Sequence, residues 1–254
     1  MNWIKVGKTS VTNARNKLVK LLVTKALDNK DNIQTNADIL SHKTIVQTLK
    51  ISGYSCNLYS EEENEVVKIN GGDDNVKIVI DPIDYTHFFL RNELSFCSVG
   101  MLIIIKNKPT YAFIASLENN DLYHCDEKFA YKNNRKITVP KKIQGRNIIL
   151  SYAPAKSRFK KFAKHLLTLT NGNYLAYNFM GLLPTAKIAD GKYDATIEIE
   201  PTPLHEFAGA LIVKRAGGVI STLEGEEIDW NPKKKQTLLV ARNKKIHQDI
   251  LKHF

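Results

Sequence analysis

The sequence predicts an α+β fold, on three observations. Apolar side chains recur at helical spacing over residues 9–27 and again over 39–50. A strand-rich stretch follows from residue 96 to about 139, in which short turn signals separate neighbouring strands, as in an antiparallel meander. The later strands and helices alternate without the regular rhythm of a doubly wound parallel sheet.

The first half of the chain begins with the two helices. We expect Thr9 or Ser10 to cap the first helix, and Ser52-Gly53 to end the second. A short segment, 56–60, leads into three consecutive glutamates, and residues 70–75 form a polar, glycine-rich loop. Strands are predicted over 76–80, 96–105, 110–116 and 122–125, with turns at 107–109 and 119–121.

The second half begins near Arg146 and mixes short strands with helices. Gly191 and Gly217-Gly218 stand where helices are expected to end. Strands are predicted over 148–151, 195–199 and 237–241, and helices over 156–169, 181–189, 205–216 and 244–251.

The charge of the chain is strongly basic, because 37 Lys and Arg face 26 Asp and Glu, a formal net charge of +11. Such a chain favours anionic partners, whether phosphorylated metabolites, nucleic acid or acidic lipid. Three cysteines without a CxxC pair argue against a disulfide framework or a structural zinc site. The N-terminus lacks the apolar core of a secretory signal, and the apolar run 99–105 is too short to span a bilayer. We therefore expect a soluble protein of the cytoplasm that does not enter a membrane.

The most informative motif is Asp81-Pro82-Ile83-Asp84, at the end of an otherwise apolar strand. Pro82 restricts Asp81 to an extended backbone, and Thr86 begins a possible helix. Two carboxylates at such a turn, beside the amides of a helix start, can hold a hard cation and a phosphate together. The alternative is a solvated surface turn, and the motif alone leaves both open.

The segment 79–86, with this motif at its centre, resembles the DPIDGT signature of the inositol monophosphatase family. Other family elements are matched in order along the chain: Thr35-Asn36-Ala37-Asp38, Tyr59-Ser60-Glu61-Glu62, Gly191-Lys192-Tyr193-Asp194-Ala195, and residues 207–218. The resemblance covers essentially the whole chain. It implies a layered αβαβα sandwich with a metal-bearing half over 1–147, a second half over 148–254, and the site between them. It also implies a homodimer.

The resemblance implies oxygen ligands for two or three Mg²⁺ ions. By residue these are Glu61, Asp81, Asp84 and the carbonyl of Ile83. Mg²⁺ prefers such hard oxygen ligands and leaves coordination positions for water and for substrate phosphate.

The remaining roles that the resemblance implies concern water, phosphate and substrate. Asp38, Glu62 and Thr86 would orient the attacking water, and the amides of Tyr85 and Thr86 would bind the phosphate. Glu198 would hydrogen-bond a substrate hydroxyl. Asp38 has a second interpretation, as a cap of the helix that begins near residue 39.

Three departures from the family pattern lie at the site. Tyr85 stands where the family has glycine, and Phe88 replaces a polar residue. Aligned without gaps, Leu204-His205 takes the place of the family's Trp-Asp, so that His205 would be the last metal ligand. An imidazole favours Mn²⁺ or Zn²⁺ over Mg²⁺. The adjacent Glu206 could instead supply the carboxylate or contact the substrate, and His205 could have no metal role.

Two functions follow from these observations. The first is a divalent-metal-dependent phosphomonoester hydrolase that acts by water attack on a small sugar or inositol phosphate, such as inositol monophosphate or fructose 1,6-bisphosphate. The second is a degenerate family member that binds RNA or a protein partner. The retained carboxylates favour the first, because close carboxylates repel one another without a cation.

Overall fold

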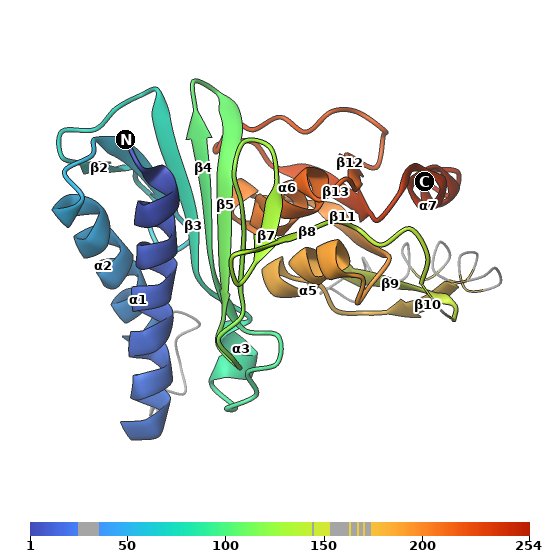
Figure 1. Ribbon diagram of the computed structural model, residues 1–254, viewed down its shortest axis with the longest axis horizontal. Helices are drawn as coiled ribbons and strands as arrows, with labels where there is room; N and C mark the ends of the chain where they lie inside the picture. Colours follow the sequence, from blue (N-terminus) through green and yellow to red (C-terminus); the bar gives the residue numbers. More distant parts are fainter. Residues whose placement is uncertain (25–35, 144, 153–162, 164–166, 168–169, 171–173) are drawn as a thin grey trace.

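The computed structural model describes residues 1–254 except 25–35, 144, 153–162, 164–166, 168–169 and 171–173. Three expectations fall on those gaps: the end of the first helix beyond Thr24, Thr35 of the first family element, and nearly all of the helix over 156–169. They lie outside the described residues. The rest of the chain forms two sheets with helices on and between them (Figure 1).

The first sheet has eight strands in the order β2-β1-β3-β4-β5-β6-β7-β8. β1 and β3 pair in parallel, and the other neighbours are antiparallel, so that β3 to β8 form a meander. The bounds are β1 Cys56–Ser60, β2 Val67–Ile69, β3 Val76–Asp84, β4 Ser98–Ile105, β5 Lys108–Ser116, β6 Leu122–Cys125, β7 Ala130–Lys132 and β8 Arg135–Ile137.

The second sheet has five strands in the order β10-β9-β11-β13-β12. β9 pairs in parallel with β10 and β11, whereas β13 is antiparallel to both of its neighbours. The bounds are β9 Asn147–Tyr152, β10 Tyr174–Tyr177, β11 Ala195–Thr202, β12 Val219–Ser221 and β13 Gln236–Ala241. This sheet begins where the second half of the chain was expected to begin, although the division into halves at residue 147 stays a prediction.

Helices complete five layers (Figure 1). On the outer face of the first sheet, α1 packs on β4 and β5, and α2 packs on β3. Between the sheets, α6 contacts strands of both. On the outer face of the second sheet, α7 packs on β12 and β13. The bounds are α1 Trp3–Thr24, α2 Asn36–Ile51, α5 Leu182–Ala186, α6 Ala208–Arg215 and α7 Lys244–Leu251. The α+β class and the αβαβα layering are therefore confirmed.

The first helix begins earlier than the sequence indicated. It starts at Trp3, and the Lys5 N–H donates to Asn2 Oδ1 at 3.0 Å. Ser10, expected near the start, is fully buried inside the helix. The expected cap was wrong because Asn2 serves the same purpose about two turns upstream.

Three apolar cores hold the described layers together. One lies between α1, α2 and the first sheet, with Leu18, Ile78 and Phe113 fully buried. Another lies around α5 and α6, between the sheets, with Phe207 and Leu238 fully buried. The third joins the second sheet to α7, with Leu239 and Ile250 fully buried. Each such side chain contributes about 1.5–3 kcal/mol on burial. Within the described residues, no helix has both the length and the apolar character that a membrane crossing requires.

Candidate active site

Three carboxylates from two distant parts of the chain meet at the end of β3. Asp81 and Asp84 belong to the last residues of this strand, whose apolar positions place it in the core. Glu206 comes from the 3-10 turn Leu204–Phe207, which precedes α6. One carboxylate oxygen from each of the three lies within 4.8 Å of the other two. Asp81 and Asp84 are only 2% and 7% exposed, whereas Glu206 is half-buried.

The environment of the group disfavours negative charge. Burial raises the pKa of Asp81 well above its usual value, and the charges of Glu61, Asp84 and Glu206 raise it further. Burial raises the pKa of Asp84 to about 7. The pKa of Glu206 is raised well above its usual value by burial and then by Asp84 and Glu61. Asp81 Oδ1 is buried without a hydrogen-bond partner. An orphaned oxygen among clustered carboxylates fits a hard divalent cation, which supplies the missing positive charge.

Asp84 is held in place by the start of α5. The Leu182 N–H donates to Asp84 Oδ2 at 2.7 Å, and Ser98 Oγ lies 3.4 Å from the same oxygen. A Cβ at Gly181 would lie 2.7 Å from Asp84 Oδ2, so only glycine permits this approach. Sequence reasoning missed Ser98, Gly181 and Leu182, although a glycine directly before a buried helical segment was a usable signal.

The turn after Asp84 brings Thr86 to Asp38. Thr86 Oγ1 lies 3.2 Å from Asp38 Oδ1 and donates to the Ile83 carbonyl at 2.9 Å. Asp38 is 1% exposed, and it lies in the first turn of α2, which begins at Asn36. Tyr85 has left-handed backbone angles, φ 68° and ψ 44°, and precedes the short helix α3, Thr86–Phe89. The structure therefore brings together Asp38, Ile83 and Thr86 beside the carboxylate group.

The two neighbouring glutamates after β1 differ in position. Glu61 shares a hydrogen bond with Asp81, and its pKa is raised first by desolvation and then by the charge of Asp38. Glu61 lines the cleft that contains the carboxylate group. The backbone N–H of Glu62 donates to Ser60 Oγ at 3.3 Å, and Glu62 does not belong to the described lining of this cleft.

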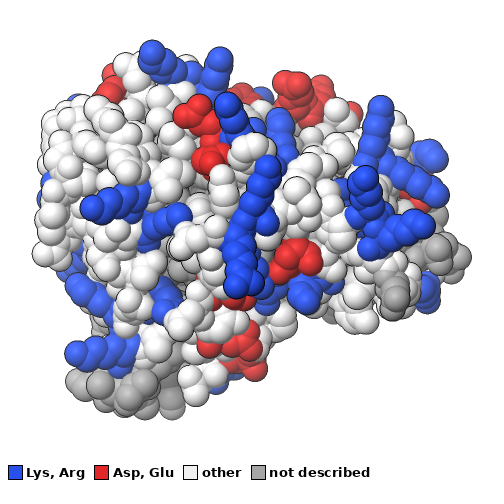
Figure 2. Space-filling view, viewed as in Figure 1, with Lys and Arg blue, Asp and Glu red and all other residues white. Residues whose placement is uncertain are grey.

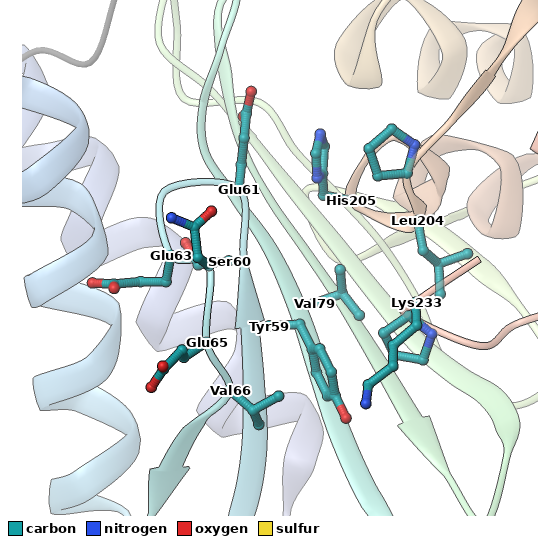
Figure 3. Close-up of a pocket in the computed structure, with 13 residues that line it drawn as sticks. Tyr59, Ser60, Glu61, Glu63, Glu65, Val66, Val79, Leu204, His205 and Lys233 are labelled. Atoms are coloured by element: carbon teal, nitrogen blue, oxygen red, sulfur yellow. The ribbon is translucent and has the colours of Figure 1, made fainter. Parts of the chain in front are cut away.

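His205 lies next to the carboxylate group but does not belong to it. Its Nε2 is 3.8 Å from Glu206 Oε1, and burial lowers its pKa to about 4, so the ring is neutral. Figure 3 shows His205 and Glu61 at one end of a neighbouring pocket, with Tyr59, Val66 and Lys233 toward the other end. A gap-free alignment assigned the last ligand position to His205. Among the described residues, Glu206 supplies the carboxylate oxygen that lies within 4.8 Å of both Asp81 and Asp84.

The cleft has a volume of about 440 Å³, within the usual range of small-molecule sites. Glu198, 6% exposed, lines it from β11, and burial raises its pKa to about 8, with Glu200 adding to the shift. The cleft is lined by Glu61, Asp81, Ile83, Asp84, Tyr85, Thr86, His87, Phe88, Met180, Glu198, Glu200, Pro201, Thr202 and Glu206. Residues from both halves of the chain thus face one space.

Known proteins resemble the chain in sequence and in fold. A putative Nus factor SuhB of Neisseria meningitidis is 28% identical over 181 residues, which cover 68% of this chain and 67% of the relative. A fructose-1,6-bisphosphatase/inositol-1-monophosphatase of Archaeoglobus fulgidus is 27% identical over 191 residues, 71% of this chain and 70% of the relative. The solved extragenic suppressor protein suhB of Bartonella henselae is 20% identical with a TM-score of 0.84, and the match covers 100% of this chain and 98% of that one. The family model of inositol monophosphatases matches residues 3–254, and the chain therefore belongs to the inositol monophosphatase family.

Proposed function

We propose that the chain is a divalent-metal-dependent phosphomonoester hydrolase whose substrate is a small phosphorylated metabolite of the sugar or inositol phosphate class. The observation that carries this proposal is the group formed by Asp81 and Asp84, both buried, and the half-buried Glu206. Clustered carboxylates with little solvent around them destabilise a protein unless protons or a cation neutralise them. In a phosphatase site the cation would also activate water and bind the phosphate.

In this proposal, Asp81, Asp84, Glu206, Glu61 and the Ile83 carbonyl hold the metal. All are oxygen donors, which favours Mg²⁺ over Zn²⁺. His205 then stays a neutral neighbour of Glu206. A cation bound there supplies Lewis-acid chemistry and lowers the pKa of water.

The side chains around the metal ligands have separate tasks. Thr86 and Asp38, joined at 3.2 Å, orient the attacking water and receive its proton. The amides of Tyr85 and Thr86, at the start of α3, bind the phosphate, since the first amides of a helix have no partner inside it. Glu198 binds a substrate hydroxyl; with its raised pKa it can donate a proton in that hydrogen bond. A catalytic role for Glu62 stays a prediction, because its side chain is not part of the described cleft lining.

The test is phosphate release from inositol, fructose and nucleotide phosphates with Mg²⁺, Mn²⁺ and Zn²⁺ in parallel. We expect metal-dependent release that Asp81→Asn abolishes and that Glu227→Gln, an exposed carboxylate away from the cleft, leaves unchanged. Release that survives Asp81→Asn would contradict the site. No release with any metal, from a protein whose thermal unfolding is cooperative, would contradict the activity.

A second candidate function is binding to RNA or to a protein partner, as a regulatory factor. It is favoured by the relatives named Nus factor SuhB and by the net charge of +11. On the face shown in Figure 2, however, Lys and Arg are spread out with acidic residues between them, not gathered in one stripe. RNA binding that weakens steeply with salt, together with no phosphate release, would support this candidate. A homodimer stays a prediction that light scattering can test.

A further inference from the structure

Three polar side chains on one face of α2 each contact a different segment of the candidate site. Asp38, Ser41 and His42 follow the i, i+3, i+4 spacing that places side chains together on a helix. They are only 1%, 0% and 8% exposed. A polar side chain is buried at a cost unless it finds a hydrogen-bond partner. Asp38 has its partner in Thr86, and the other two have theirs in the segments that carry the proposed metal ligands.

Ser41 connects α2 to the acidic motif at the end of β3. Its Oγ donates to the Pro82 carbonyl at 2.7 Å, and this hydrogen bond is buried. Pro82 stands between Asp81 and Ile83, which are both proposed metal ligands. The backbone of the motif is therefore held against α2 at its centre.

His42 makes the corresponding connection to the loop that carries Glu61. Its Nδ1 lies 3.0 Å from the Oγ of Ser60, the last residue of β1. This Oγ accepts from the Glu62 N–H at 3.3 Å, so its own hydrogen is available to the ring. Burial lowers the pKa of His42, against the opposing charge of Glu63, and Nδ1 of the neutral ring can accept that hydrogen. On the other side of the ring, Nε2 lies 3.6 Å from Glu63 Oε1.

The position of Glu61 depends on how its backbone is held. Although it lines the cleft, Glu61 keeps an exposed surface, so packing alone does not order its side chain. On one side its N–H donates to the Ile80 carbonyl at 3.2 Å. On the other side the preceding Ser60 is held by His42. Figure 3 shows Glu61 and Glu63 leaving the loop in different directions, so the contact of Glu63 with the imidazole does not draw Glu61 out of the cleft.

We propose that α2 sets the relative position of the two segments that carry the metal ligands, and that His42 is the positioning residue for Glu61. The proposal rests on the hydrolase function above, because it concerns the metal of the same site. A ligand that is already in place loses less conformational freedom when the cation binds. Groups that orient metal ligands typically contribute about 10- to 100-fold in metal affinity. Since His42 acts through Ser60, we expect an effect near the lower end.

The test measures Mg²⁺ binding by calorimetry, which needs no turnover, and phosphate release as a function of Mg²⁺ concentration. His42→Ala should raise the Kd for Mg²⁺ about fivefold or more. The Mg²⁺ concentration for half-maximal release should rise by the same factor, whereas kcat at saturating Mg²⁺ should stay within about threefold, because bound metal restores the position of Glu61.

Two conservative variants separate the two sides of the imidazole. The amide of His42→Asn takes the place of Nδ1 and can still accept from Ser60, so its Kd should stay within about twofold of wild type. The longer side chain of His42→Gln places its amide near Nε2 and loses Ser60, so it should behave like His42→Ala. If His42→Ala does not fold, this pair decides the inference.

The matched control is His247→Ala. His247 lies on α7, is 7% exposed, and places Nε2 2.8 Å from Ser221 Oγ, outside the described lining of the cleft. The variant loses a buried histidine–serine hydrogen bond of the same kind, so it should lower Tm and leave the Kd for Mg²⁺ unchanged.

The outcomes distinguish this inference from the proposed function. An unchanged Kd in His42→Ala, or an equal rise in His247→Ala, would overturn the inference and leave the hydrolase intact. Mg²⁺ binding without phosphate release would contradict the hydrolase alone, and the Kd values would still decide the inference. A wild-type protein that binds no Mg²⁺ would overturn both.

Discussion

Glu206→Gln separates the role of Glu206 from that of its neighbour His205. Two unit charges 4.8 Å apart repel by about 3.5 kcal/mol at an effective dielectric constant of 20. Glu206 makes two such pairs, with Asp81 and Asp84, when the site is empty of metal. The raised pKa values mean that protons relieve part of this repulsion. We therefore expect the variant to gain about 1–2 kcal/mol of unfolding free energy in EDTA at pH 8.5, or about 2–6 °C in Tm.

With Mg²⁺ present, the wild-type protein should instead be the more stable of the two. A ligand at 100 times its Kd stabilises the wild-type protein by about 2.7 kcal/mol, whereas Glu206→Gln has one anionic ligand fewer and should show a much smaller rise in Tm with Mg²⁺. Differential scanning fluorimetry, with and without Mg²⁺, measures both shifts. His205→Gln is the matched control, because it alters the adjacent position and should keep the full Mg²⁺ response.

Two results would refute this reasoning. One is a Glu206→Gln variant that is no more stable than wild type in EDTA and keeps its Mg²⁺ response. The other is loss of the Mg²⁺ response in His205→Gln alone, which would return the ligand position to the imidazole.

Three further predictions follow from burial and backbone geometry. Without metal, Asp84 and Glu198, with pKa values of about 7 and about 8, keep protons that the unfolded chain has already lost. Their stabilising contribution is therefore complete below about pH 4 and lost by about pH 8, and denaturation in EDTA at pH 5, 6.5 and 8 should show a falling unfolding free energy. Tyr85→Gly relieves about 1 kcal/mol of left-handed backbone strain but removes two aromatic contacts and a hydrogen bond. We therefore expect the free energy of unfolding to fall by about 1–3 kcal/mol, and the phosphate-release panel to show a broader range of substrates. Asp194 is 2% exposed and lies 2.8 Å from the Arg242 guanidinium, so Arg242→Ala leaves a buried carboxylate without its partner. Urea denaturation should show a free energy of unfolding lower by about 3–5 kcal/mol. A loss below about 1 kcal/mol would mean that solvent reaches the pair.

Much of the fold was predictable because local signals agree with the tertiary structure. The run VKIVI, buried except at Lys77, forms the first five residues of strand β3. Asn119 and Asn120 mark the turn between β5 and β6, as expected. The parallel pairing of β1 with β3 was not predictable, since it depends on contacts between segments that no local pattern connects.

The choice between His205 and Glu206 shows where sequence reasoning failed to decide. The sequence pattern predicts one regular helix from residue 205 onward. The structure has a 3-10 turn over Leu204–Phe207 and an α-helix only from Ala208. A 3-10 turn advances each residue by about 120° around its axis instead of about 100°, so a helical pattern does not fix the directions of its side chains. Glu206 reaches the carboxylate group, and His205 lines the neighbouring pocket.

The amide of Leu182 that holds Asp84 belongs to a helix of apolar, buried residues, and that helix packs closely on α6. A Cβ at Gly209 would lie only 2.7 Å from the Leu182 carbonyl, so even an alanine there displaces the start of α5. At the proposed metal site, affinity should thus respond to substitutions that carry no charge and touch none of the proposed ligands. A genetic screen for variants that require more Mg²⁺ should return positions in the apolar middle layer alongside the acidic motif.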